Sequence, residues 1–239
     1  MKVTLINHTS DAAVLLIFTK GTRLGLTPGR YEAIKNMSSD KKMEELKYIA
    51  STIPSSWEFV DYTFVIEGVS RAFTHQLVRT RTASYAQESL NVVDKRNLEY
   101  VFTEEDNKAN TKHRIIEYID YTKALYKELL SAGVSKGSAR GILPIHTATN
   151  IVMKCNLRTL NQLVRTRLGR RNNSEFPKVL NAMVDEVLKV HPWTDLFLWG
   201  EATRDHYKDI ETAIVRNVTD QKAQWDMLKM IDKMRREEK

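Results

Sequence analysis

Strand-like patterns occur only in the first 66 residues of this 239-residue chain, whereas helical patterns dominate the rest. Residues 2–7 alternate in the manner of a strand, and residues 57–66 are rich in aromatic and β-branched side chains, so both segments are expected to be strands. A chain whose strands come early and whose helices come late lacks the regular alternation of a wound parallel sheet. The order of patterns therefore predicts the α+β class.

Apolar spacing and capping residues indicate where the helices lie. Ser70 is a candidate N-cap and Gly133 a candidate C-cap, because each type satisfies backbone groups at a helix end. Residues 12–18 form the longest apolar stretch, which fits a buried strand or helix and is too short to cross a bilayer. The helices expected are one from the caps at residues 38–40 to residue 53, a short one after Ser70, one after a cap at Ser135, and others over residues 103–132, 150–167 and 176–190.

The last forty residues differ from the rest. Met227, Met230, Ile231 and Met234 fall at helical spacing and make a narrow apolar seam on an otherwise charged segment. Such a seam suits docking onto the main body or onto a neighbouring subunit. The chain is therefore expected to consist of one domain over residues 1–199 and a helical extension over residues 200–239.

Composition excludes several classes of protein. The lone Cys155 cannot form an internal disulfide, which is typical of a reducing compartment and predicts a cytoplasmic location. The six histidines form no closely spaced pair, so no metal site is expected. There is also no glycine-rich phosphate loop and no Gly-x-Ser-x-Gly elbow.

One hexapeptide, QLVRTR, occurs twice, at residues 76–81 and 162–167. Each copy ends in two arginines separated by a threonine. Residues 69–86 contain no acidic residue, and the whole chain has a net charge of +7. Arginine recognises phosphate through a planar fork, so two such pairs suit an anionic, phosphate-bearing nucleotide. Ordinary surface ion pairs and a nucleic-acid patch are the alternatives for arginines of this kind.

The sequence around these arginines resembles the signature motif of the flavin-dependent thymidylate synthases. Arg79-Thr80-Arg81, seven residues and then Ser89 follow the family's Arg-His-Arg signature and its closing serine. The similarity covers about residues 1–197, with further matching segments at residues 57–64, 139–144, 156–160 and 192–193.

The resemblance implies a fold, ligands and roles for particular residues. It implies an antiparallel sheet packed with helices, a homotetramer, bound FAD, and NADPH and methylenetetrahydrofolate as co-substrates, with a deoxypyrimidine monophosphate such as dUMP as substrate. Nucleic acid and a membrane are not expected as partners. The residues implied to bind FAD are Glu58, Arg79, Arg81, Asn156, Arg158 and Gln162, and those implied to bind the nucleotide are Gln76, Arg79, Gln87, Ser89, Arg140 and Arg167, with Arg167 as the catalytic group that positions and polarises the pyrimidine.

The implied chemistry agrees with the residue types. Adding a carbon at C5 of uracil requires negative charge to develop on the ring, and a fixed guanidinium stabilises such a charge. Flavin reduced by NADPH supplies the hydride, so no protein thiol is needed. Cys155 lies beside Ile151, Val152 and Met153 and is expected to be buried packing.

Four positions depart from the family's longer pattern. Thr80 replaces its histidine, Ala86 its asparagine, Gln87 its glutamate and Asn91 its last arginine, and residues 51–53 stand where the family has another histidine. Thymidylate synthesis from dUMP is the function expected. A variant that forms a hydroxymethyl product or accepts dCMP stays open, as does a silent homologue that binds nucleic acid.

Overall fold

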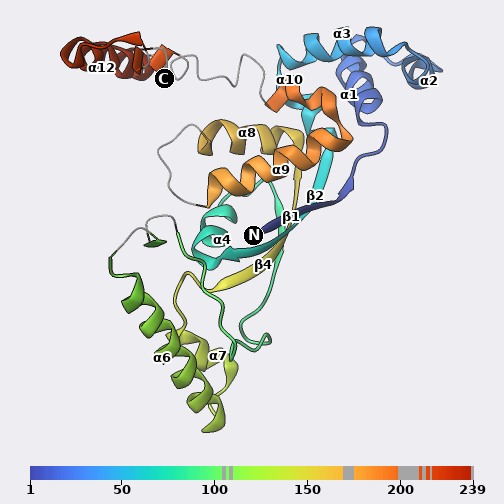
Figure 1. Cartoon of the computed structure of the whole chain (residues 1–239). Helices are drawn as coiled ribbons and strands as arrows, with labels where there is room; N and C mark the ends of the chain where they lie inside the picture. The colour runs from blue at the N-terminus through green and yellow to red at the C-terminus, as the bar shows by residue number, and fades with distance from the viewer. Residues whose placement is uncertain are drawn as a thin grey trace. The chain divides into compact units, whose positions relative to one another are not determined.

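Residues 1–198 contain a four-stranded antiparallel sheet with the strand order β1-β2-β4-β3 (Figure 1). The computed structural model describes residues 1–103, 106–107, 110–168, 175–198, 210–211, 214–215 and 217–237. The strands are β1 (Lys2–His8), β2 (Asp61–Ser70), β3 (Ser84–Gln87) and β4 (Ala148–Asn156).

Helices make up most of the remaining structure (Figure 1). The longer ones are α1 (Ala12–Gly21), α3 (Ser39–Ala50), α6 (Lys112–Ser131), α8 (Leu157–Arg167), α9 (Phe176–Val190) and α12 (Gln221–Glu237). The shorter ones are η1 (Thr22–Leu24), α2 (Arg30–Lys35), η2 (Pro54–Phe59), α4 (Arg71–Leu77), α7 (Lys136–Ala139), η3 (Arg140–Ile142), η4 (Pro192–Thr194) and α10 (Asp195–Leu198).

One face of the sheet carries the core. On β2, Tyr62, Phe64 and Ile66 are buried at every second position, as the two-residue period of a strand requires. They lie opposite Cys155, Met153 and Ile151 of β4 in the antiparallel register. Helices α8 and α9 run side by side in Figure 1, with α9 packed on β1 and β2 and α8 packed against β4 and α9.

The chain divides into two compact units, residues 1–198 and residues 199–239. The second unit contains α12, which includes the methionines of the apolar seam. Among the described residues, no helix combines the length and the apolarity that crossing a membrane requires.

The α+β class is confirmed, and so are several capping residues. The Oγ atoms of Ser38, Ser70 and Ser135 accept hydrogen bonds from backbone amides in the first turns of α3, α4 and α7. Gly133 follows α6 with φ of 85°, a left-handed conformation that glycine adopts without strain.

Four boundaries expected from the sequence were wrong. The helix expected to reach residue 53 ends at Ala50. Residues 150–156 are not helical but belong to strand β4, and the helix begins only at Leu157. Residues 57–59 lie in η2, so β2 starts at Asp61 rather than at residue 57. Helix α6 starts at Lys112 instead of residue 103. Residues 170–173, whose arginines and asparagines predict a turn between the helices that the sequence places at 150–167 and 176–190, lie outside the described residues.

Candidate functional site

The two copies of the hexapeptide line one cavity of about 260 Å³. The first copy contributes the end of the turn that follows α4, and the second contributes the exposed face of α8. The residues that line this arginine cavity are Arg79, Thr80, Arg81, Thr82, Gln162, Leu163, Thr166 and Arg167. Segments more than 80 residues apart in the sequence are thus brought together by the fold.

Three guanidinium groups make the arginine cavity strongly positive. Arg79 and Arg81 are exposed, and within the described parts of the chain neither they nor Arg167 forms a salt bridge with a carboxylate. The Arg167 guanidinium lies 5.1 Å from the centre of the Phe176 ring, a cation–π contact that restricts its orientation. A cavity with this lining favours an anionic ligand.

Tyr85 fixes the turn that carries Arg79 and Arg81. Its hydroxyl lies 2.9 Å from the carbonyl oxygen of Leu77 and 3.0 Å from that of Thr80, so it can donate to either end of the turn. Burial raises the pKa of Tyr85 to about 12, which keeps the hydroxyl protonated as a donor.

A second contact joins this turn to α8. The Thr159 hydroxyl donates to the Thr82 hydroxyl over 3.0 Å. Because Thr159 lies in the first turn of α8, the two walls of the arginine cavity are linked directly.

Helix α8 presents its polar face to the arginine cavity because its other face is buried. Leu157, Leu160 and Leu163 are buried at helical spacing, which leaves Arg158 and Gln162 exposed. Asn156 begins the helix, since its Oδ1 accepts from the Thr159 amide over 2.9 Å. This capping role was not expected from the sequence, which assigned Asn156 to flavin binding.

Two other residues implied to bind FAD contact each other. The Arg158 guanidinium donates to the Glu58 carboxylate over 2.5 Å, and about half of each side chain is exposed. Of the flavin-side residues, Arg79, Arg81 and Gln162 line the arginine cavity, whereas Glu58, Asn156 and Arg158 lie at the start of α8 or beside it.

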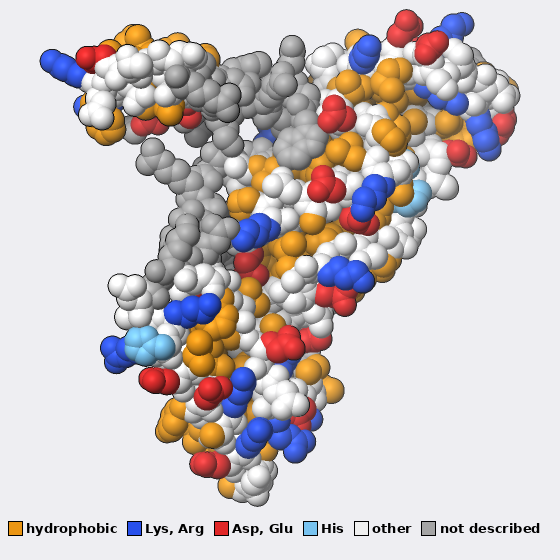
Figure 2. Space-filling view, viewed as in Figure 1, with side chains coloured by type: hydrophobic (Ala, Val, Ile, Leu, Met, Phe, Trp, Pro, Cys, Tyr) orange, Lys and Arg blue, Asp and Glu red, His pale blue; other side chains and the backbone are white. Residues whose placement is uncertain are grey.

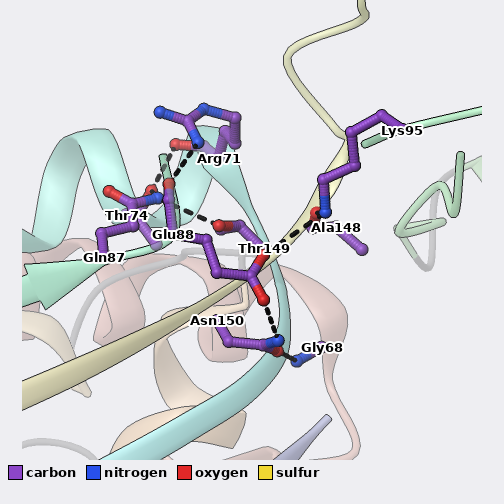
Figure 3. A network of polar contacts seen from close by, with 9 residues as sticks. All are labelled: Gly68, Arg71, Thr74, Gln87, Glu88, Lys95, Ala148, Thr149 and Asn150. Atoms are coloured by element: carbon purple, nitrogen blue, oxygen red, sulfur yellow. Dashed lines mark hydrogen bonds and ion pairs between the residues drawn. The ribbon is translucent and has the colours of Figure 1, made fainter. Parts of the chain in front are cut away.

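Of the residues implied to bind the nucleotide, Arg79 and Arg167 line the arginine cavity, and the others lie outside its lining, with Gln87 at the end of β3 and Ser89 just after it. Gln76 is exposed on α4, Ser89 accepts from the Asn91 amide over 3.3 Å, and Arg140 donates through Nε to the Gly137 carbonyl over 3.1 Å. Gln87 is half-buried, and its Nε2 donates to the Thr74 hydroxyl over 2.9 Å (Figure 3).

A polar network that the sequence did not reveal holds this end of β3 in place (Figure 3). The Glu88 carboxylate accepts from Asn150 Nδ2 over 2.5 Å and from Lys95 Nζ over 3.3 Å. Asn150 Oδ1 also accepts from the Gly68 amide, at a bulge in β2 where Gly68 has φ of 65°. The residues involved are far apart along the chain, so no local pattern could have indicated them.

Cys155 is buried in the core, as expected. Burial, and to a smaller extent the charge of Asp61, raises the pKa of its thiol to about 12. A thiol in that state supplies no thiolate near neutral pH, which disfavours a role as nucleophile.

Comparisons with known proteins identify the family. Residues 4–193 match the model of the Thy1 family, described as thymidylate synthase complementing protein. The flavin-dependent thymidylate synthase of Clostridium tetani is 32% identical over 211 residues, covering 80% of this chain and 84% of that protein. The enzyme of the same name from Pyrococcus furiosus is 36% identical over 151 residues, covering 60% and 61%.

The fold also matches solved structures. Two structures of ThyX, the flavin-dependent thymidylate synthase of Helicobacter pylori, with FAD and dUMP superpose with TM-scores of 0.62 and 0.65. Their sequence identities are 19% and 18%, and they cover 81% and 86% of this chain and 97% and 100% of theirs. With the family model matching most of its length, this chain belongs to the flavin-dependent thymidylate synthase family.

Proposed function

We propose that this protein is a flavin-dependent thymidylate synthase that methylates dUMP at C5 to form dTMP. The observation that carries the proposal is the cavity that Arg79, Arg81 and Arg167 line in a chain of this family. Methylenetetrahydrofolate provides the carbon and NADPH the reducing equivalents, with FAD as the cofactor.

The arginine cavity fits the anionic part of FAD. Arg79 and Arg81 would bind the pyrophosphate, since their guanidinium forks match phosphate oxygens and form no salt bridge among the described residues. Gln162 and Arg158 would add contacts from the exposed face of α8, with Asn156 and Glu58 beside them. Bound flavin, once reduced, supplies the hydride of the reaction.

Arg167 would act on the pyrimidine. Its contact with Phe176 limits the orientations of its guanidinium. A fixed positive charge near the ring oxygens would stabilise the negative charge that develops when C5 attacks the carbon donor. The buried Cys155 thiol takes no part in this step.

Residues on α4, at the end of β3 and after α7 would bind the rest of the nucleotide. Ser89 and Arg140 would contact the phosphate, and Gln76, Gln87 and Arg79 would contact the nucleoside. The side-chain amide of Gln87 is held by Thr74, so its orientation is set before the nucleotide arrives.

We further propose a homotetramer in the cytoplasm. Hydrophobic side chains reach the surface over α6 (Figure 2), where Tyr118 and Tyr121, three residues apart on one side of the helix, are at least 50% exposed. Such a patch favours association with another copy. Cys155 remains a free thiol, which suits a reducing compartment.

Product analysis tests the proposed function. The full chain is incubated with FAD, NADPH, methylenetetrahydrofolate and either dUMP or dCMP, and products are identified by mass spectrometry. The expected result is dTMP from dUMP. A hydroxymethyl product or turnover of dCMP alone would replace the proposal with a variant reaction. Absence of any product from protein that does not bind FAD, together with steeply salt-dependent binding of single-stranded DNA, would indicate a nucleic-acid-binding homologue.

A further inference from the structure

The turn at residues 88–92 lies against an arginine that neither the sequence nor the family pattern indicated. Arg71 is the first residue of α4, and its guanidinium donates to the backbone carbonyl of Glu88 over 3.5 Å (Figure 3). The side chain is half-buried. Arg71 is therefore directed toward the backbone that carries Ser89.

A second arginine approaches the same turn through α7. Lys136 donates to the Val92 carbonyl over 2.9 Å, and a Cβ at Gly137 would come within 2.9 Å of the Asn91 side-chain oxygen. The turn and α7 are thus in contact. Arg140 follows α7, and its Nε is bound to the Gly137 carbonyl.

The Glu88 carboxylate acts on Arg71 electrostatically, but the described residues show no ion pair between the two side chains. The Glu88 carboxylate is already engaged by Lys95 and Asn150. Across the ranges that the structure describes, neither Arg71 nor Arg140 forms a salt bridge. Burial lowers the pKa of Arg71, the charge of Arg140 lowers it further, and the Glu88 carboxylate acts in the opposite direction. Like charges held together in this way favour an anion between them.

We propose that Arg71 and Arg140 together bind the 5′-phosphate of the nucleotide, which makes Arg71 a further substrate-binding residue. The inference rests on the proposed function. A phosphate monoester carries close to two negative charges, and two guanidinium forks can share its three terminal oxygens. Ser89 lies next to the carbonyl that Arg71 contacts, and the neutral Asn91 adds no charge of its own.

The Glu88 network would keep this phosphate site ready for binding. Glu88 is tied through its side chain to Asn150 and through its amide to the Asn150 carbonyl, at 3.2 Å. Asn150 is in turn bound to the bulge at Gly68. These contacts connect the Glu88 backbone, whose carbonyl orients Arg71, to β4 and β2. The Arg71 side chain therefore needs little reorganisation when phosphate binds.

Binding measurements on charge-removing variants test the inference. The full-length parent, Arg71→Gln and Arg71→Lys are titrated calorimetrically with dUMP and with deoxyuridine, which lacks the phosphate. Arg96→Gln is the matched control, because it removes the same charge from an arginine that pairs with Asp94 over 2.6 Å in the same region. FAD binding serves as the check of folding, because it uses the arginine cavity.

The expected result is that Arg71→Gln weakens dUMP binding about 10- to 100-fold, the effect of losing one charge-assisted contact, and leaves deoxyuridine and FAD binding unchanged. Arg71→Lys should lie between the parent and Arg71→Gln, because an ammonium keeps the charge but not the fork. The inference is overturned, while the proposed function stands, if Arg71→Gln binds dUMP with the affinity of Arg96→Gln. It is also overturned if Arg71→Gln weakens deoxyuridine binding by the same factor as dUMP binding. A parent that binds FAD but not dUMP would overturn both.

Discussion

The Arg158 guanidinium and the Glu58 carboxylate lie 2.5 Å apart and join the start of α8 to η2. Half of each side chain is exposed, and an ion pair of that kind contributes at most about 1 kcal/mol to stability. Arg158→Ala should therefore leave the unfolding midpoint almost unchanged. It should weaken FAD binding about tenfold, measured by quenching of flavin fluorescence, if Arg158 contacts the cofactor.

The pair between Lys154 and Asp61 provides the control. It joins β4 to β2 over 2.8 Å with similar exposure and lies outside the arginine cavity. Lys154→Ala should match Arg158→Ala in stability and match the parent in FAD binding. Equal FAD binding by all three proteins would remove Arg158 from the flavin site.

Tyr85→Phe tests whether the turn that carries Arg79 and Arg81 must be held rigid. The change removes the hydroxyl that contacts the carbonyls of Leu77 and Thr80, at a cost of about 1 kcal/mol in unfolding free energy. FAD affinity should fall several-fold because the two arginines lose their fixed position. Tyr48→Phe, which removes the hydroxyl that accepts from Arg23 on the α3 side, should leave FAD affinity intact.

Cys155→Ala should retain turnover. The thiol is buried and its raised pKa of about 12 keeps it protonated, so it cannot serve as the nucleophile. Removing the sulfur leaves a small void in the core and should cost about 1 kcal/mol of stability. Turnover that disappears while the unfolding transition stays cooperative would contradict this expectation and revive a covalent mechanism.

The α+β class could be predicted from the sequence, although two of the four strands, β3 and β4, lie among the helices beyond residue 66. Strand β4 was missed because only single polar residues, Lys154 and Asn156, separate its apolar residues from those of α8. Its burial alternates, with Ile151, Met153 and Cys155 inward, and this period of two was present in the sequence. The change from one period to the other occurs at Asn156, whose capping role shows only in three dimensions.

The arginine cavity could be predicted in part, because the repeated hexapeptide contains residues of both of its walls. The position of Arg71 relative to Arg140 could not be predicted from the sequence. Their proximity depends on how α4, the turn after β3 and α7 pack together, and Glu88 contacts a residue 62 positions away. Contacts of this range leave no periodic trace in a sequence.

His191 should make stability depend on pH. It is buried beside Tyr62, with 3.0 Å between its Nδ1 and the tyrosine hydroxyl. Burial, followed by the charge of His8, lowers the pKa of His191 from 6.5 to about 4. The unfolded chain therefore takes up a proton on this histidine between pH 6.5 and pH 4 that the folded chain does not, and stability falls as the pH falls through that window.

His191→Asn should flatten this dependence, since asparagine does not titrate. Chemical unfolding of the parent and the variant at pH 7, 6, 5 and 4.5 would measure it. His113→Asn, at an exposed histidine of α6, should keep the slope of the parent. Parallel curves for the parent and His191→Asn would assign the acid sensitivity to other groups.

Arg140→Ala should weaken dUMP binding by about 1.5 to 3 kcal/mol, the cost of one charge-assisted contact. Arg140 is exposed, and within the described parts of the chain its guanidinium forms one hydrogen bond, from Nε to the Gly137 carbonyl, which leaves its terminal N–H groups available to a ligand. FAD binding should change little, because Arg140 does not line the arginine cavity.

Asn91→Arg should have the opposite effect and tighten dUMP binding. Asn91 is exposed beside α7, where the absence of a Cβ at Gly137 leaves room for its side chain. An added guanidinium there would face the same anion as Arg140 and Arg71. It should therefore also recover dUMP affinity when combined with Arg71→Gln. Calorimetric titration of the single and double variants with dUMP and dCMP measures both effects. If Arg140→Ala binds like the parent and Asn91→Arg recovers nothing, the phosphate does not lie at this turn and the nucleotide site must be sought elsewhere on the chain.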